Sequence, residues 1–382
     1  MALTGNKGEW SEIYVLVSLL ADGKLFQSDI NLEKDYNNIY EIVKAYKSEG
    51  NYNLEFGRTN KVSLYRFENE IREYITSFTL DELKDISRKL YEGIRDGKGK
   101  TFKIVEVDNF LNKASISKLK AESSSKSDLK LRIYDHRLAI ETDLGFSIKS
   151  LIGGDSTLFN TGPGNNFIYR IEDRLDSTVT EFNKRTYITP NRISKITYRL
   201  TELAKMDCKI QFEKIQSYQL WKNLKMIDGD LPDIMAYSLY YKWIYRLSSL
   251  VKVSELLELN DPLNFYNNQP SEQKLYDYKI KRFLTECAMG MTSEKPWHGE
   301  YDSIGGVIIA KNDGDIVCFH IYDFNLFRNY LINNTVFEQA STGEDKSNPG
   351  FPREEGKKYY YGWLYKEMDS LFFKINLQIR FR

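Results

Sequence analysis

Apolar and polar residues alternate most regularly in two neighbouring segments, residues 127–134 and 144–150. Such alternation is typical of half-buried strands, because successive side chains of a strand point to opposite faces of the sheet. The apolar positions are Leu129, Leu131 and Ile133 in the first segment and Leu144, Phe146 and Ile148 in the second. We therefore predict an antiparallel hairpin whose turn lies near Leu138 and Ala139.

The polar face of this hairpin carries the residues that suggest a chemistry. Folding it back places Asp128 roughly opposite Lys149, and directly opposed Cβ atoms are about 4.5–5.5 Å apart. A carboxylate so placed can hold a divalent metal ion while the amine helps to orient a water, as phosphodiester hydrolysis requires. Asp135 has the parity of the apolar set and lies about 23 Å along the strand, so we rank Asp128 above it. An ordinary hairpin with a solvated charged face is the alternative.

A second source of carboxylates precedes the hairpin. Apolar residues recur at helical spacing over residues 8–21, which predicts an amphipathic helix that ends at Asp22 and Gly23. Glu9 and Glu12 are three residues apart and so lie near each other on its surface. The helix could deliver one carboxylate to a metal site, or the two acids could simply favour its N-terminus electrostatically.

The rest of the chain predicts a mixed fold with a mostly helical middle region. We expect helices at 35–48, twice within 68–96, at 107–120, across most of 190–290 and at 324–333. Thr79 is a candidate N-cap and Gly97 a stop signal. We expect strands over 52–67, a hairpin at 303–323, and strands at 358–366 and 370–381.

The loop that follows the hairpin is a candidate DNA-contacting segment, because it is rich in glycine, amide and hydroxyl residues. Asparagine pairs well with adenine, and serine and threonine hydroxyls bind phosphates. The candidates are Ser150, Thr157, Asn160, Asn165 and Asn166. The alternative is a turn-forming loop, since Gly, Pro and Asn are favoured in turns for backbone reasons.

Composition narrows the class of protein. The 382 residues contain 54 Lys and Arg and 54 Asp and Glu, and this balance argues against a strongly basic coat for nucleic acid. The three cysteines are widely spaced, so neither a disulfide framework nor a zinc pattern is present. No apolar run is long enough for a membrane span, and the N-terminus has no apolar signal core. We expect a cytoplasmic protein.

Several segments, taken together, resemble the HpaII family of type II restriction endonucleases. They run in order from the first predicted helix to the last strand: Gly8 to Tyr14, Leu20 to Leu25, Lys126 to Asp128, Gly145 to Ser150, Thr157 to Asn160, Asn166 and Phe167, Gly305 and Gly306, Phe319 to Tyr322, Tyr330 and Leu331, Asn334 and Thr335, and Leu377 to Phe381.

The resemblance implies a nuclease core of the PD-(D/E)XK type, a central mixed sheet flanked by helices, in an α+β protein. It implies Mg²⁺ as cofactor and cleavage of double-stranded DNA at a short palindrome such as CCGG. A palindromic target favours a homodimer, and a cognate DNA methyltransferase would act on the same site. Asp128 would be the first metal carboxylate and Lys149 the motif lysine.

One position departs from that motif. Where it requires Asp or Glu, two residues before the lysine, this chain has Ser147. A hydroxyl is a poorer ligand for a hard cation than a carboxylate, so another acid must supply the charge. Glu12 is our first choice as the second metal ligand, and Glu9, Asp143 and Asp155 are the alternatives.

We expect three segments: a nuclease core over 1–185, a helical DNA-recognition region over 186–295, and a β-rich part over 296–382 that completes or packs on the core. Two further functions stay open at this point. One is a nuclease that requires methylated cytosine, and the other is a DNA-binding protein that does not cleave.

Overall fold

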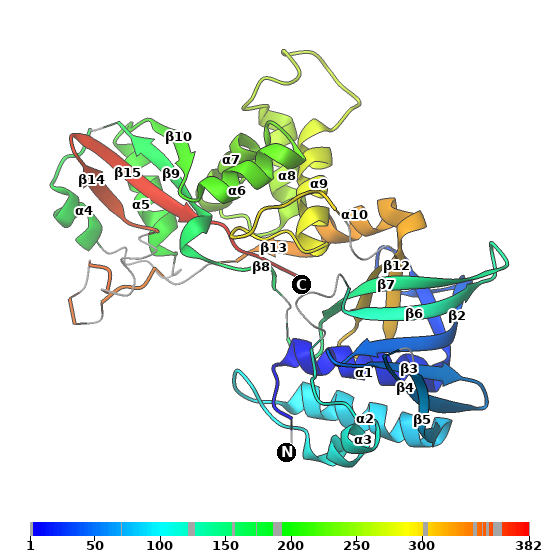
Figure 1. The fold of residues 1–382 in the computed structure, drawn as a ribbon. Coiled ribbons are helices and arrows are strands. Elements are labelled where there is room, and N and C mark those ends of the chain that lie inside the picture. Colours follow the sequence, from blue (N-terminus) through cyan, green and yellow to red (C-terminus); the bar gives the residue numbers. More distant parts are fainter. Residues whose placement is uncertain are drawn as a thin grey trace. The chain divides into compact units, whose positions relative to one another are not determined.

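The computed structural model describes residues 3–69, 71–120, 127–154, 157–172, 174–185, 193–300, 305–338, 342–345, 347–348, 351–353 and 361–381. The chain divides into two compact units (Figure 1). Unit 1 comprises residues 1–156 and 301–330, and unit 2 comprises residues 157–300 and 331–382. These boundaries differ from the three segments expected from the sequence, since the chain returns to unit 1 after residue 300.

Unit 1 is built on a nine-stranded mixed sheet of order β1-β12-β11-β7-β6-β2-β3-β4-β5. The strands are β1 (Lys24–Ser28), β2 (Lys34–Ser48), β3 (Asn53–Arg58), β4 (Lys61–Glu68), β5 (Ile71–Thr79), β6 (Leu129–Asp135), β7 (Ile140–Ser150), β11 (Gly306–Ala310) and β12 (Ile316–His320). Strand β1 pairs in parallel with β12 and antiparallel with β2. The hydrogen-bonded path from β1 through β12, β11, β7, β6 and β2 therefore returns to β1.

The predicted hairpin is confirmed as β6 and β7, but its register differs from the expected one. Leu129 pairs with Phe146 and Asp135 with Ile140. Continued by one residue, this register places Asp128 opposite Ser147, so the expected pairing of Asp128 with Lys149 was wrong by two residues. Leu129, Leu131 and Ile133 are buried as predicted.

The helix predicted at 35–48 was wrong, because these residues form the long strand β2. Its aromatic and β-branched residues favour a strand, and each half has its own partners: β1 along the first half, β3 along the second, and β6 across the middle. The first helix predicted within 68–96 was also wrong, since β5 occupies that stretch.

Helices α1 (Lys7–Asp22), α2 (Leu80–Asp96), α3 (Asp108–Lys113) and α10 (Phe324–Asn333) complete the described helices of this part, α10 running on into unit 2. Helix α1 lies between the sheet and α2 (Figure 1). Asn6 and Glu9 form a capping box on α1, and Gly23 ends it at φ 73°. Thr79 and Glu82 form the capping box of α2, which confirms Thr79 as its N-cap.

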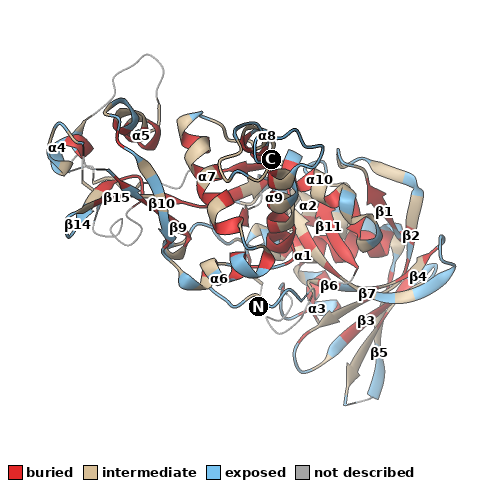
Figure 2. Cartoon of the chain, turned by 90° about the horizontal axis from the view of Figure 1, so that it is seen from above, coloured by how far each residue is buried: buried red, intermediate tan, exposed pale blue. Residues whose placement is uncertain are grey.

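Burial explains why α1 is central to unit 1. Eleven of its sixteen residues are buried, and Figure 2 shows the buried positions gathered along α1 and β11. The same hydrophobic core takes in Leu129, Leu131 and Phe146 of the hairpin. The core thus fixes α1 against β6 and β7.

Unit 2 combines helices with two small sheets. The helices are α4 (Val179–Lys184), α5 (Lys195–Lys205), α6 (Tyr218–Ile227), α7 (Leu231–Ile244), α8 (Leu250–Asn260) and α9 (Leu275–Ala288). One sheet has the order β10-β9-β15-β14, from β9 (Asn166–Ile171), β10 (Ile210–Ile215), β14 (Leu364–Glu367) and β15 (Ser370–Asn376). The other has the order β13-β16-β8, from β8 (Thr157–Phe159), β13 (Thr335–Phe337) and β16 (Ile379–Phe381).

The mixed α+β class and the mostly helical 190–290 region are confirmed, apart from the strand β10. The hairpin at 303–323 is present as β11 and β12, antiparallel across the predicted turn. The described helices include none that is long and apolar enough to cross a bilayer.

Candidate active site

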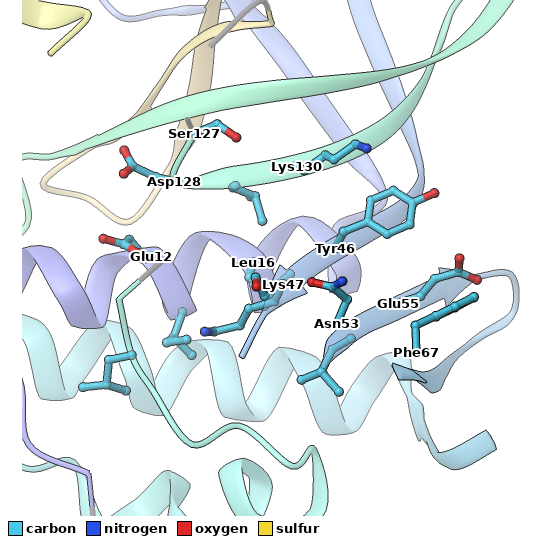
Figure 3. A pocket seen from close by; sticks show the side chains of 15 residues that line it. Glu12, Leu16, Tyr46, Lys47, Asn53, Glu55, Phe67, Ser127, Asp128 and Lys130 are labelled. Carbon is cyan, nitrogen blue, oxygen red and sulfur yellow. The ribbon is translucent and has the colours of Figure 1, made fainter. Parts of the chain in front are cut away.

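A cavity of about 420 Å³ in unit 1 brings together residues from α1, from strands β2 and β3, and from the start of β6. Its lining includes Glu12 and Leu16 of α1, Lys47 of β2, Glu55 of β3, and Asp128 directly before β6. Figure 3 shows the carboxylates of Glu12 and Asp128 at the same end of this cavity. Two acids that are 116 positions apart in the sequence thus share one site.

Asp128 is held by two hydrogen bonds to β7. Its backbone N–H donates to the Phe146 carbonyl at 3.0 Å, and its carboxylate Oδ2 accepts the Ile148 N–H at 2.8 Å. A backbone N–H bound to a carboxylate is a charge-assisted hydrogen bond, which fixes the orientation of the group. The other oxygen, Oδ1, makes no hydrogen bond to any described residue, so a ligand in the cavity can use it.

Glu12 lies one turn inside α1 and is half-buried. Glu9 has a different role, because it belongs to the capping box of α1. Its carboxylate Oε2 accepts the Asn6 N–H at 2.9 Å. Glu9 therefore completes the helix N-terminus, while Glu12 lines the cavity. The two acids are three residues apart on α1, but only Glu12 is among the residues that line the cavity.

The other two candidates for the second carboxylate have different surroundings. Asp143 accepts hydrogen bonds from Arg132 Nε at 2.7 Å and Nη2 at 3.0 Å, and the hydrogen bond from Arg132 lowers the pKa of Asp143. Asp155 lies outside the described residues. Asp135 is buried, accepts the Arg137 N–H at 2.8 Å and so serves the hairpin turn.

Ser147 and Lys149 lie on β7, two residues apart and hence on one face of the strand. Asp128 and Lys149 are then diagonal neighbours, with Cβ atoms about 7–8 Å apart, within reach of a lysine side chain. Lys149 is half-buried and is not among the residues that line the cavity.

The predicted DNA-contacting residues fall into two groups. Asn165 and Asn166 are fully buried: Asn165 donates to the Asn160 and Leu377 carbonyls, and Asn166 donates to Gln216 and accepts from Asn376. These bonds hold both amides inside unit 2. Asn160 is exposed, Thr157 is half-buried at the start of β8, and Ser150 accepts a hydrogen bond from Ser11 at 2.8 Å.

Sequence reasoning missed Lys47, which lines the same cavity as Asp128 and Glu12. Since the sequence predicts a helix over residues 35–48, it gives no indication that Lys47 lies beside the site. The signal available was the aromatic and β-branched content of the stretch, which favours a strand over a helix.

The donor set of the cavity fits a hard divalent cation. No group of three or more His, Cys, Asp or Glu that could hold a metal ion occurs in the described part of the chain, so the cavity offers a pair of carboxylates. Mg²⁺ is commonly bound through one or two carboxylates together with waters and substrate phosphates. Asp128 and Glu12 supply that number of carboxylates, and the remaining volume leaves room for the other ligands.

Comparison with known proteins defines the class. The family model for HpaII restriction endonuclease matches residues 6–381. The chain is also 33% identical over 386 residues to the type II restriction enzyme HpaII of Haemophilus parainfluenzae, covering 99% of this chain and 98% of that enzyme. No solved structure matches. The protein is a type II site-specific deoxyribonuclease, which acts on double-stranded DNA. Within this class, the chain belongs to the HpaII restriction endonuclease family.

Proposed function

We propose that this restriction endonuclease hydrolyses DNA phosphodiester bonds with Mg²⁺ held by Asp128 and Glu12. Restriction endonucleases generally use a divalent metal ion, and the observation that carries the proposal is the shared cavity of these two carboxylates. When bound, the metal ion would polarise the scissile phosphate and stabilise the charge that develops on the leaving 3′ oxygen.

The protein's own groups have separate tasks in this proposal. Asp128 is oriented by the Ile148 N–H, and Glu12 supplies the carboxylate that Ser147 cannot. Lys149 extends from the neighbouring strand β7 and would orient the attacking water and stabilise charge on the phosphate. An acid before one strand and a lysine on the next are compatible with the PD-(D/E)XK pattern, and this supports our proposal that unit 1 is a nuclease core of that type.

We further propose that the target is a short palindrome such as CCGG and that two copies of the chain bind it with two-fold symmetry. The target is proposed from the family membership. Asn160, Thr157 and Ser150 remain candidate DNA contacts, whereas the buried amides of Asn165 and Asn166 are used in hydrogen bonds inside unit 2. A methyltransferase of the same specificity would protect host DNA.

Incubation of the purified protein with a sequenced plasmid tests the proposal. Discrete fragments with Mg²⁺, none with EDTA, and cuts that map to one short palindrome are expected. Fragments that form equally well in EDTA would exclude the metal-dependent mechanism. Parallel digestion of CpG-methylated plasmid should give no cutting, while cutting of methylated plasmid alone would show a modification-dependent enzyme.

A further inference from the structure

Lys47 places a buried positive charge beside the cavity of the proposed metal site. It lies on β2, its side chain is only 9% exposed, and it lines the cavity with Glu12 and Asp128. Figure 3 shows Lys47 of β2 among the side chains that line this cavity. Burial of an ammonium group is costly unless the charge is paired and its N–H donors are used, so its partners need to be identified.

One partner of Lys47 is Glu49, whose Oε1 lies 2.9 Å from the ammonium. The Glu49 side chain is fully buried. Its other oxygen, Oε2, accepts the Ser117 N–H at 2.8 Å, the Ser117 hydroxyl at 2.6 Å and the Lys118 N–H at 3.2 Å. Glu49 is therefore fixed, and it holds Lys47 in place against the segment that leads towards β6.

The ion pair leaves donors of Lys47 unused. A lysine ammonium has three N–H donors, yet the Nζ atom is buried and makes no hydrogen bond of good geometry in the structure. An unsatisfied buried donor is unfavourable. Lys47 is a lining residue of the cavity, so a turn of its side chain would bring the ammonium to an oxygen of a ligand, which can supply the missing acceptor.

The charges in the cavity indicate which ligand this would be. A bound Mg²⁺ would offset the two negative charges of Glu12 and Asp128, but a DNA phosphate brings one more. Phosphate oxygens are strong hydrogen-bond acceptors, and lysine binds them as a point charge. We propose that Lys47 binds a non-bridging phosphate oxygen of the DNA strand in the cleavage site. This inference rests on the proposed function, and it adds a lysine that the nuclease motif does not contain.

The test compares Lys47→Met with a matched variant of the same strand, Lys44→Met. Lys44 pairs with Glu55 at 3.2 Å, and Glu55 keeps a second partner in Arg72 at 2.9 Å, so its loss leaves no unpaired acid. Lys44 is not among the cavity-lining residues. Lys47→Met would leave Glu49 buried and unpaired, so the double variant Lys47→Met/Glu49→Gln removes both charges and keeps the fold testable.

Single-turnover cleavage and the salt dependence of DNA binding are the measurements. For both Lys47 variants we expect cleavage slower by about 10²-fold, the usual effect of losing one charge-stabilising donor. The slope of log K against log salt should shrink by about 0.9, as for one lost phosphate contact. Lys44→Met should keep the wild-type cleavage rate.

Two results would overturn the inference. One is a folded Lys47→Met/Glu49→Gln protein that cuts within about twofold of wild type. The other is a changed melting temperature with an unchanged salt slope and rate, which would reduce Lys47 to a structural partner of Glu49. Asp128→Asn serves as the separate control: if it also cuts normally, the proposed metal site fails, whereas its inactivity beside an active Lys47 variant refutes only the role of Lys47.

Discussion

Replacement of Asp128 by asparagine should slow cutting severely while leaving the fold nearly intact. Asparagine keeps an oxygen that can accept the Ile148 N–H, which now lies 2.8 Å from Oδ2. The bond loses its charge assistance, worth about 1 kcal/mol, and this corresponds to a fall in melting temperature of about 2–4 °C.

The effect on catalysis should be much larger. A metal ion contributes several kcal/mol of charge stabilisation in the transition state. If the weakened site loses about 4 kcal/mol of it, cleavage slows by about 10³-fold, since each 1.36 kcal/mol corresponds to a factor of ten. Single-turnover cleavage with saturating enzyme and Mg²⁺, measured beside thermal melting, separates the two effects.

Asp135→Asn is the matched control, because it removes the other acid of the same hairpin strand. Asp135 is 3% exposed and bound to the Arg137 backbone, so this variant should lose stability but keep the wild-type cleavage rate once folded. A folded Asp135→Asn protein that cannot cut, beside an Asp128→Asn protein that can, would refute the assignment.

Three further predictions follow from other parts of unit 1. Glu12→Gln should slow cleavage by at least about 10²-fold, whereas Glu9→Gln should cut normally, since glutamine still completes a capping box; equal activity of the two variants would remove Glu12 from the site. Burial lowers the pKa of His320 from 6.5 to about 4, so between these values the unfolded chain binds a proton that the folded one does not. The free energy of unfolding should therefore fall by about 2 kcal/mol between pH 7 and pH 5, and denaturant titrations should show a smaller fall for His320→Asn; an identical fall would contradict the burial argument. Gly306→Ala should destabilise the protein by about 3 kcal/mol or more, because Gly306 has φ 112° and an added Cβ would lie 2.0 Å from the Phe319 carbonyl oxygen; Gly57→Ala, with its nearest atom at 3.9 Å, should melt near the wild-type temperature.

The parts of the fold that could be predicted are those with a clear local sequence pattern. The β6–β7 hairpin alternates regularly, and the predicted N-cap of α2, Thr79, lies within four residues of its capping-box partner Glu82. These local patterns can be recognised without knowing which distant residues the segment contacts. The register of the hairpin was set two residues away from the true one, because a turn position known to within a residue shifts every cross-strand pair.

Strand β2 could not be predicted from its period. The pairing of β2 with β6 shifts register between Ile42 and Lys44, so Tyr40 and Ile42 are buried before the shift and Ala45 after it. A bulge of this kind breaks the alternation that identifies a strand. The remaining aromatic spacing then imitates a helix, and tertiary pairing decides the structure.

The same limit applies to the site. Asp128 and Glu12 could be proposed because a strand and a helix pattern each marked a carboxylate. Lys47 could not, since its element was misread. The loop amides are the opposite case. Asn165 and Asn166 have the chemistry of base contacts, but they form hydrogen bonds within the protein, to Leu377, Gln216 and Asn376. Only the tertiary structure distinguishes a polar residue that holds a loop from one that the loop presents.

The central claim is that Asp128 and Glu12 together hold the catalytic metal ion, and anomalous diffraction from crystals soaked in Mn²⁺ tests it most directly. The account predicts a manganese peak in the cavity within about 2.2 Å of an oxygen of each carboxylate, as expected for a small hard cation. That peak should be absent in Asp128→Asn crystals. A single strong peak elsewhere in the protein, with none between Asp128 and Glu12, would contradict the account.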